Sequence, residues 1–304
     1  MIKSRSFNGP LLFLVSIVWL SCAYFNTYYN AEKYFNDADK LRLEKEGKSI
    51  PLSALDKYGK TIQKCQKVLK EYPESELRIN AILLMSKARY YRREYDDALM
   101  DLRIVNEKGD ADQVDEAQYW VALCKWKKGT IQPAIDELTL LIKNTDIQDL
   151  QAMCHLSLAE IAEELKDEES ILYHLEIGAD LMRDRAQRGV IYGKLAEFAF
   201  QNENYEVAIT TYNKVIKNSL SKEKVEESHL QVLRILRMQG NYRAAAKKIK
   251  AMLTDEKFKN IAGNLELELV QHYMAQNEIE EAISRLETII NDYQRTKASA
   301  EAYF

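Results

Sequence analysis

The sequence predicts an all-α protein, a right-handed α-solenoid of about seven helical hairpins. A small residue returns every 36 to 38 positions, and apolar residues follow it by four and by seven positions. These offsets lie on one face of a helix, and a fixed period of roughly 20 to 50 residues indicates stacked helical units. The 304 residues contain only 4 Pro and 10 Gly, and no segment alternates like a β-strand. The recurring small residues are Thr61, Ala98, Ala134, Ser170, Ala208, Ala245 and Ala282.

Residues 1–21 have the layout of an export signal peptide. Two basic residues precede the apolar run Leu11–Leu20, and the small residue Ser21 lies directly before Cys22. A charged start, an apolar centre and a small residue are the parts of such a signal. The apolar run is too short to cross a bilayer, which takes about 20 residues. We therefore predict that residues 1–21 are removed from the mature chain.

The end of this signal resembles the lipobox of bacterial lipoproteins. The resemblance implies that Cys22 becomes the mature N-terminus and carries acyl chains such as palmitate. Trp19 and Leu20 differ from the residues that the lipobox favours. Ala23 stands where an aspartate retains proteobacterial lipoproteins in the inner membrane, which implies the periplasmic face of the outer membrane. The alternative is an ordinary signal peptide, or a short anchor, with an incidental cysteine.

Residues 22–51 form the predicted lipidated segment and first helix. Several apolar residues in this segment have helical spacing, which predicts one face of a helix that runs to about Leu43. Alternatively, the rings of this segment lie at the level of the lipid headgroups. A polar loop, Lys45–Pro51, follows the helix. The apolar residues with helical spacing are Tyr28, Ala31, Phe35 and Ala38.

Residues 52–304 form the predicted repeat solenoid. Upstream of nearly every small residue lies a second apolar-periodic segment of about 15 residues. A short polar break joins the two segments, and such breaks suit the tight turn of a helical hairpin. We expect the small residue to let the two helix backbones of a hairpin approach each other. The breaks include Arg92–Glu94, Lys128–Thr130, Gln201–Asn204, Gln239–Asn241 and Gln276–Glu278.

This pattern resembles the tetratricopeptide repeat family. The matching runs read Tyr-x-x-small-x-x-x-apolar-x-x-apolar, and Pro73 stands where the family often ends a helix. The period here is longer than the family's, which is about 34 residues. The chain stops at Ala300–Phe304, inside what reads as the opening helix of another repeat, which is either a cap or the edge of a fragment. The clearest runs are Tyr95–Val105, Tyr205–Val215 and Tyr242–Met252.

Composition and motifs argue against several classes of function. The net charge is −4, and loss of the two basic residues in the signal leaves −6. We expect no nucleic-acid partner, because nucleic-acid-binding domains are basic. The four histidines show no metal-ligand spacing, and the chain has no phosphate-binding glycine loop or nucleophile motif. We therefore predict that the protein is not an enzyme and has no cofactor and no metal site.

Three cysteines besides Cys22 lie in apolar-periodic helical segments, at Cys65, Cys124 and Cys154. Buried free thiols are the simplest interpretation of such positions. A bridge between Cys124 and Cys154 is the alternative in an oxidising periplasm, because sequence spacing does not decide pairing.

The segment 79–127 is the predicted partner-binding region. Rings stand there beside basic residues, and such pairs form hot spots when they are exposed. They would fit an extended partner segment with aromatic and acidic groups. The alternative is that half of these rings belong to the repeat core, while the basic run from Arg234 to Lys250 is expected to be a solvated face. The candidate binding residues are Tyr90, Tyr91, Arg92, Arg93, Tyr119, Trp126 and Lys127.

Signal, cysteine and repeats together resemble a BamD-type lipoprotein of the outer-membrane β-barrel assembly machine. Tyr72–Ser75, Ala88 and the pair Tyr90-Tyr91 match motifs of that family, although this chain has more repeats. The resemblance implies a non-catalytic scaffold that binds envelope proteins or extended peptide segments and reaches the membrane through its lipid anchor. A secretion or motility apparatus is an alternative setting, and the repeat region of a longer enzyme is another. The oligomeric state stays open.

Overall fold

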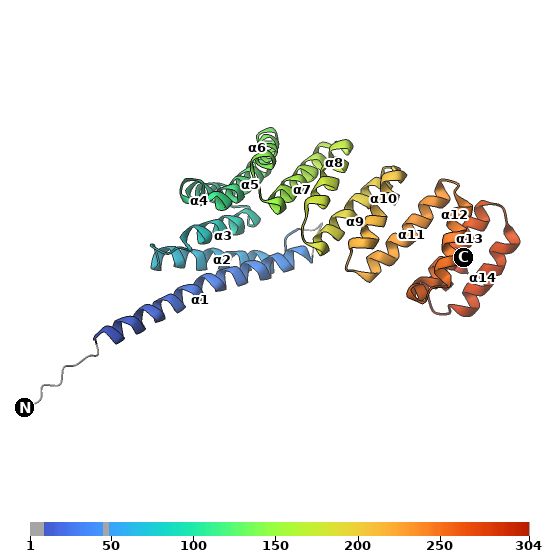
Figure 1. Ribbon diagram of the computed structural model, residues 1–304, viewed down its shortest axis with the longest axis horizontal. Helices are drawn as coiled ribbons and strands as arrows, with labels where there is room; N and C mark the ends of the chain where they lie inside the picture. The colour runs from blue at the N-terminus through green and yellow to red at the C-terminus, as the bar shows by residue number, and fades with distance from the viewer. Residues whose placement is uncertain (1–8, 45–48, 304) are drawn as a thin grey trace, which may run out of the picture. The chain divides into compact units, whose positions relative to one another are not determined.

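The computed structural model describes residues 9–44 and 49–303, with side chains from Asn26 onward. Helices make up 84% of the structure, and the described residues contain no strand (Figure 1). The predicted all-α repeat fold is thus confirmed. The first eight helices are α1 (Gly9–Leu43), α2 (Leu52–Glu71), α3 (Arg78–Tyr91), α4 (Tyr95–Lys108), α5 (Ala111–Lys127), α6 (Ile131–Asn144), α7 (Gln148–Leu165) and α8 (Glu168–Leu181). The others are α9 (Arg185–Gln201), α10 (Tyr205–Asn218), α11 (Lys222–Met238), α12 (Tyr242–Leu253), the short 3-10 helix η1 (Glu256–Ile261), α13 (Ala262–Ala275), α14 (Ile279–Asp292) and α15 (Lys297–Ala302).

The chain divides into two compact units, which meet between Ser157 and Leu158 within α7. Unit 1 contains α1–α6 and the first part of α7, and unit 2 contains the helices from the rest of α7 to α15. In unit 1 each helix from α1 to α6 packs against the next, and in unit 2 each α-helix from α8 to α15 does the same. Each odd-numbered helix up to α13 is the first helix of a hairpin, and the even-numbered helix after it is the second. The short helix α15 follows the last of these hairpins and contacts both α13 and α14.

The recurring small residue lies early in the second helix of the hairpins. Ala98, Ala134, Ala208 and Ala245 are each the fourth residue of that helix, and each is completely buried. In α2 the equivalent residue, Thr61, comes later and is equally buried. Ser170 differs, because it is only half-buried. A small side chain takes up little space between two helices, so the two helices of the hairpin can pack closely.

A residue with positive φ ends the first helix of every hairpin after the first. Lys166, for example, has a φ of 59°, and Gly240 has a φ of 73°. The amide of the next residue donates back to the carbonyl five positions earlier, as in Thr130 to Lys125 at 3.0 Å. This is the Schellman ending, in which a left-handed residue closes the helix. The predicted polar breaks are therefore helix caps, with the left-handed residue at Arg93, Gly129, Lys166, Glu203, Gly240 and Asn277.

Helix α1 is the first helix of the first hairpin. Ala31 and Ala38 are completely buried in the cluster that joins α1, α2 and α3, and Tyr28 and Phe35 pack against that cluster. The hydroxyl of Thr61 in α2 donates to the carbonyl of Ala31 at 3.3 Å. These contacts confirm the interpretation of this segment as an apolar helix face. The array of hairpins therefore begins before residue 52.

The N-terminal motif lies at the edge of the described chain. Residues 1–8 of the predicted signal lie outside the described residues, and the side chain of Cys22 is not among those described. Within the part of the chain that the structure covers, no helix is both long and apolar enough to cross a membrane.

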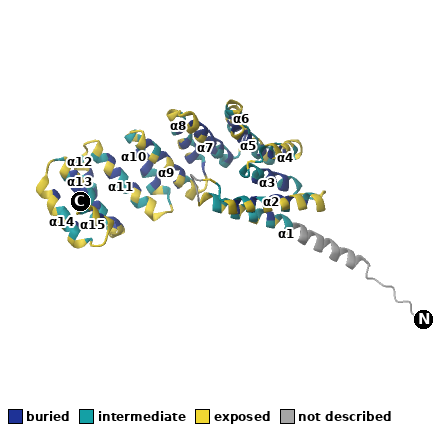
Figure 2. Ribbon diagram, turned by 180° about the vertical axis from the view of Figure 1, so that it is seen from behind, coloured by how far each residue is buried: buried dark blue, intermediate teal, exposed yellow. Residues whose placement is uncertain are grey.

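First helices are covered more completely than second helices. In unit 1, α3 and α5 each bury seven residues, whereas α4 buries four and α6 three. Figure 2 shows this difference as more of the buried colour on α3 and α5. A first helix is covered by its hairpin partner and by the hairpins before and after it, so fewer of its side chains reach solvent.

Candidate functional site

An aromatic cluster crosses the first three hairpins of unit 1. The ring of Tyr91 stacks on that of Tyr58, with centroids 5.0 Å apart. Phe35 meets Tyr58 edge-on at 5.5 Å, and Trp120 meets Tyr91 edge-on at 5.7 Å. Tyr90 lies 5.2 Å from Trp120. The rings come from α1, α2, α3 and α5, so the cluster holds successive hairpins together.

Two of the four candidate binding rings, Tyr119 and Trp126, are buried. Tyr119 is 6% exposed and Trp126 is 4% exposed. The hydroxyl of Tyr119 forms a hydrogen bond of 3.0 Å with the hydroxyl of Ser157 in α7, so it faces the next first helix. Tyr90 and Tyr91 are half-buried within the aromatic cluster. Tyr119 and Trp126 are thus core rings, which agrees with the alternative that half of these rings belong to the repeat core.

The predicted basic residues of this region contact their own chain. Arg92 donates to the carbonyl of Leu55 at 2.8 Å and to Glu94 at 2.7 Å. The ammonium of Lys127 lies 3.1 Å from the ring centroid of Trp126. Arg93 is exposed and is the left-handed residue that ends α3. Of the predicted basic residues, Arg93 and Lys127 reach solvent, while Arg92 is half-buried and holds α3 to α2.

Unit 1 contains a pocket on the side where its first helices meet. Its volume is about 260 Å³, and its walls come from α1, α3 and α5. Two rings and two leucines supply the apolar part, and amides and charged groups supply the rest. The lining residues are Tyr28, Glu32, Phe35, Asn36, Asn80, Leu83, Leu84, Lys87 and Glu116.

The polar groups of this pocket divide into paired and unpaired ones. Lys87 in α3 forms an ion pair with Glu116 in α5, and Trp120 donates to the same carboxylate at 3.4 Å. The Asn80 side chain accepts a hydrogen bond of 2.6 Å from Gln113.

Glu32 and Asn36 form no hydrogen bond or ion pair with any residue whose side chain the structure describes. Both groups are therefore available to a partner, which makes this pocket the candidate site.

Sequence reasoning missed Glu32 and Asn36. Glu32 follows Tyr28 by four residues and Asn36 follows Glu32 by four, so all three lie along one face of α1, next to Phe35. The spacing becomes informative once α1 is taken as the first helix of a hairpin. The sequence pattern places the start of the solenoid at residue 52, after α1. The candidate partner contacts predicted from it therefore lie only within residues 79–127.

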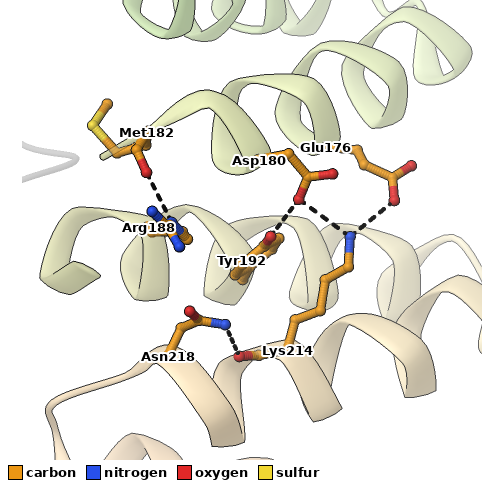
Figure 3. Close-up of polar contacts among 7 residues, drawn as sticks. All are labelled: Glu176, Asp180, Met182, Arg188, Tyr192, Lys214 and Asn218. Carbon is orange, nitrogen blue, oxygen red and sulfur yellow. Dashed lines mark hydrogen bonds and ion pairs between the residues drawn. The ribbon is translucent and has the colours of Figure 1, made fainter. Parts of the chain in front are cut away.

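Unit 2 contains a polar cluster between α8, α9 and α10 (Figure 3). Lys214 in α10 pairs with Glu176 at 3.2 Å and with Asp180 at 3.4 Å, both in α8. The hydroxyl of Tyr192 in α9 donates to Asp180, and the ammonium of Lys214 lies 5.0 Å from the Tyr192 ring centroid. Arg188 donates to the carbonyl of Met182 at 2.8 Å. Every charge drawn there has a partner inside the unit, so the cluster joins neighbouring repeats.

A second set of charges in unit 2 joins α11 to α13. Arg234 and Arg237 lie 3.9 Å and 3.7 Å from the carboxylate oxygens of Glu268. Burial raises the pKa of Glu268, and the two arginines oppose that effect. His272 is completely buried, and its Nδ1 contacts the Glu268 carbonyl at 2.6 Å. This first-helix surface combines two guanidinium groups with one carboxylate, so part of the basic run is not simply a solvated face.

Comparisons with known proteins support the fold and leave the function open. No family model matches the chain, and no curated protein matches it. The C-terminal part of a tetratricopeptide-repeat-containing protein from Cytophaga hutchinsonii is similar, with a TM-score of 0.51 at 14% identity, covering 89% of this chain and 99% of that one.

Two other solved structures are also similar, with lower TM-scores. A tetratricopeptide repeat protein from Parabacteroides merdae covers 90% of this chain and 97% of its own, at 13% identity and a TM-score of 0.37. The apo form of the quorum sensor NprR from B. thuringiensis covers 92% of this chain and 84% of its own, at 16% identity and a TM-score of 0.47. The hairpins and the Cytophaga structure together show a fold of the tetratricopeptide repeat type.

Proposed function

We propose that this protein is a non-catalytic scaffold of the bacterial envelope, anchored in the outer membrane through acyl chains on Cys22. Its partner contact is the pocket of unit 1, where an extended segment of another protein docks against α1, α3 and α5. Glu32 and Asn36 carry this proposal, because a bound segment would supply partners that the described side chains do not give them. Stacked hairpins offer such surfaces to other proteins as a rule.

The anchor and the pocket lie close together along α1. The helix is continuous from Gly9 to Leu43, and Cys22 precedes Tyr28 by six residues, about 9 Å along the helix axis. A lipid on Cys22 would therefore hold the pocket near the membrane surface. The pocket would then be placed to bind a protein that lies at the membrane surface or extends from it. Assembly of β-barrel outer-membrane proteins is the setting that we propose, and a secretion or motility apparatus is the alternative.

Filling the pocket tests the proposed docking surface. Asn36→Trp places a bulky ring on an exposed residue of the pocket wall, and Lys33→Trp places the same ring on an exposed residue of α1 outside the wall. The tagged wild-type chain and the two tagged variants are crosslinked in cells, purified from detergent-solubilised envelope and compared by mass spectrometry. We expect Asn36→Trp to lose a crosslinked partner that the wild type and Lys33→Trp retain. Equal recovery in all three chains would place the contact elsewhere.

Replacing the cysteine tests the anchor separately. Cys22→Ala should release the protein from the membrane fraction, or block processing of residues 1–21, because no acyl chain can then be attached. Cys65→Ala is the matched control, since that thiol is buried in the hairpin core. A Cys22→Ala chain that stays in the membrane after a carbonate wash would refute lipid anchoring at this position.

A further inference from the structure

We propose that the pocket of unit 1 takes a cationic side chain, a lysine or an arginine, from an extended partner segment. This inference rests on the proposed docking of a partner in that pocket and names the chemistry of the residue that enters it. It differs from the expectation raised by the sequence, which predicted an acidic partner from the basic residues of 79–127.

The charges of the pocket favour a cation. Two carboxylates, Glu32 and Glu116, line it, and among the described lining residues Lys87 carries the one positive charge. Lys87 is already paired with Glu116. The neighbouring Lys33 is exposed and is not part of the wall. The pocket thus has an excess of one negative charge, located on the half-buried Glu32.

The uncharged groups fit the same occupant. Tyr28 and Phe35 lie one turn before and about one turn after Glu32 on α1 and bring two rings to the pocket. Rings attract a cation through their faces, and more strongly when water is excluded. Asn36 has a side-chain carbonyl that can accept a hydrogen bond from an ammonium or guanidinium group, or from the backbone of an extended segment.

The size of the pocket agrees with a single side chain. Its volume of about 260 Å³ lies below the range of about 300 to 1,000 Å³ that is usual for small-molecule sites. The apolar stem of a lysine or arginine would cover Leu83 and Leu84, and its charged end would reach Glu32. An acidic side chain would instead meet an unpaired carboxylate.

Of the basic residues that suggested an acidic partner, Arg93 and Lys127 reach solvent outside the pocket, and Arg92 is engaged elsewhere, as are its basic neighbours. Arg89 pairs with Asp101 at 2.7 Å, and Arg92 holds Leu55 and Glu94. Lys125 pairs with Glu137, and Lys128 pairs with Asp96. None of these basic residues lines the pocket. The basic residue that an acidic segment would meet in the pocket is Lys87, which is already paired with Glu116.

Selection from a random peptide library tests the inference, because it requires no purified partner. The full chain, purified in detergent, is immobilised and presented with phage that display random twelve-residue peptides. In parallel, the library is selected on Glu32→Gln and on Glu74→Gln, a matched control with an exposed carboxylate outside the pocket. Melting temperatures of all three chains are measured first, and they should agree, since neither carboxylate pairs with a residue whose side chain the structure describes.

We expect peptides selected on the wild type and on Glu74→Gln to be enriched in lysine and arginine. Glu32→Gln should lose this enrichment. A selected peptide should bind Glu32→Gln about five- to tenfold more weakly than wild type, between the effects of exposed and buried charge pairs. Changing the peptide's lysine to glutamine should weaken binding to the wild type and leave binding to Glu32→Gln unchanged, which is the signature of a direct pair.

The outcomes separate the two proposals. A different result is that the selected peptides bind the wild type and fail to bind Asn36→Trp, yet show no enrichment in lysine and arginine, or an enrichment in acidic residues. That result would overturn the inference and leave the docking pocket intact. A lysine effect of equal size in wild type and in Glu32→Gln would also overturn it. Failure to select any peptide that Asn36→Trp excludes would remove the docking pocket itself.

Discussion

Tyr91 of α3 stacks on Tyr58 of α2, with ring centroids 5.0 Å apart and ring planes 18° from parallel. The guanidinium of Arg42, from α1, lies 4.5 Å from the Tyr91 ring centroid. The Tyr58 hydroxyl donates to Asp39, also in α1, at 2.7 Å. Three helices therefore meet around one stacked pair. This arrangement ties the second hairpin to the first, so the contact contributes to stability more directly than to partner binding.

Tyr91→Ala should lower the free energy of unfolding by about 2 to 3 kcal/mol, less than the loss for a fully buried ring, because Tyr91 is half-buried. Tyr91→Phe keeps the stacked ring and should cost much less. Tyr29→Ala is the control, since that ring is 64% exposed on α1. Urea unfolding followed by circular dichroism measures all three. A Tyr91→Ala chain as stable as Tyr29→Ala would contradict the structural role.

The repeat register could be predicted from the sequence because the small residue serves one steric purpose in each hairpin. Ala98, Ala134, Ala208 and Ala245 all lie at the same place in their helices and are all buried. A position with one geometric requirement accepts few side chains, so it repeats visibly. The polar breaks were predictable for a similar reason, because each contains the left-handed residue of a helix cap.

The proposed binding surface could not be predicted from the sequence in the same way. A first helix such as α5 is covered on several sides, so its rings show no single apolar stripe that would separate core from surface. Trp126 beside Lys127 looks like an exposed hot spot in sequence, yet the ring is buried. Whether a carboxylate such as Glu32 has a partner depends on α3 and α5, which lie some 50 to 80 residues away in sequence. Such a partner is visible only in the folded structure, where these helices pack together.

Glycine at the left-handed caps should stabilise the fold. Glu203 has a φ of 56°, a conformation that costs a side-chain-bearing residue about 1 kcal/mol and glycine little. Glu203→Gly should therefore raise the free energy of unfolding by up to about 1 kcal/mol. Glu206→Gly, three residues later within α10, should lower it by a similar amount, since glycine is unfavourable in a helix. Equal changes of the same sign at both positions would show that the cap geometry does not matter.

The three described cysteines should resist both alkylation and oxidation in the folded protein. Cys65, Cys124 and Cys154 are buried and free, and burial raises the pKa of each thiol to about 12. The thiolate is the reactive form, so these thiols should react slowly at neutral pH. Maleimide labelling followed by mass spectrometry should modify none of them in native protein and all three in urea. A disulfide between Cys124 and Cys154 in protein isolated from the envelope would contradict this.

Asp101 should make stability depend on pH in an unusual direction. It is nearly buried in α4 beside Arg89 of α3, at 2.7 Å. Burial raises the pKa of Asp101 to about 6, although Arg89 opposes the shift. An unfolded aspartate has a pKa near its ordinary value of 3.8. Between these two values the folded chain binds more protons than the unfolded chain, so the free energy of unfolding falls as the pH rises.

Asp101→Asn should remove this dependence, because an amide does not titrate. Relative to wild type, the variant should gain up to about 3 kcal/mol of stability between pH 4 and pH 7, the free energy that corresponds to the shift in pKa. Its absolute stability also reflects the lost charge beside Arg89, so the change with pH is the informative quantity. Urea unfolding at a series of pH values measures it, with the exposed Asp112→Asn as control. If Asp101→Asn and Asp112→Asn follow the wild-type pH profile equally, the Asp101 carboxyl group is not the buried acid that the structure places between α3 and α4.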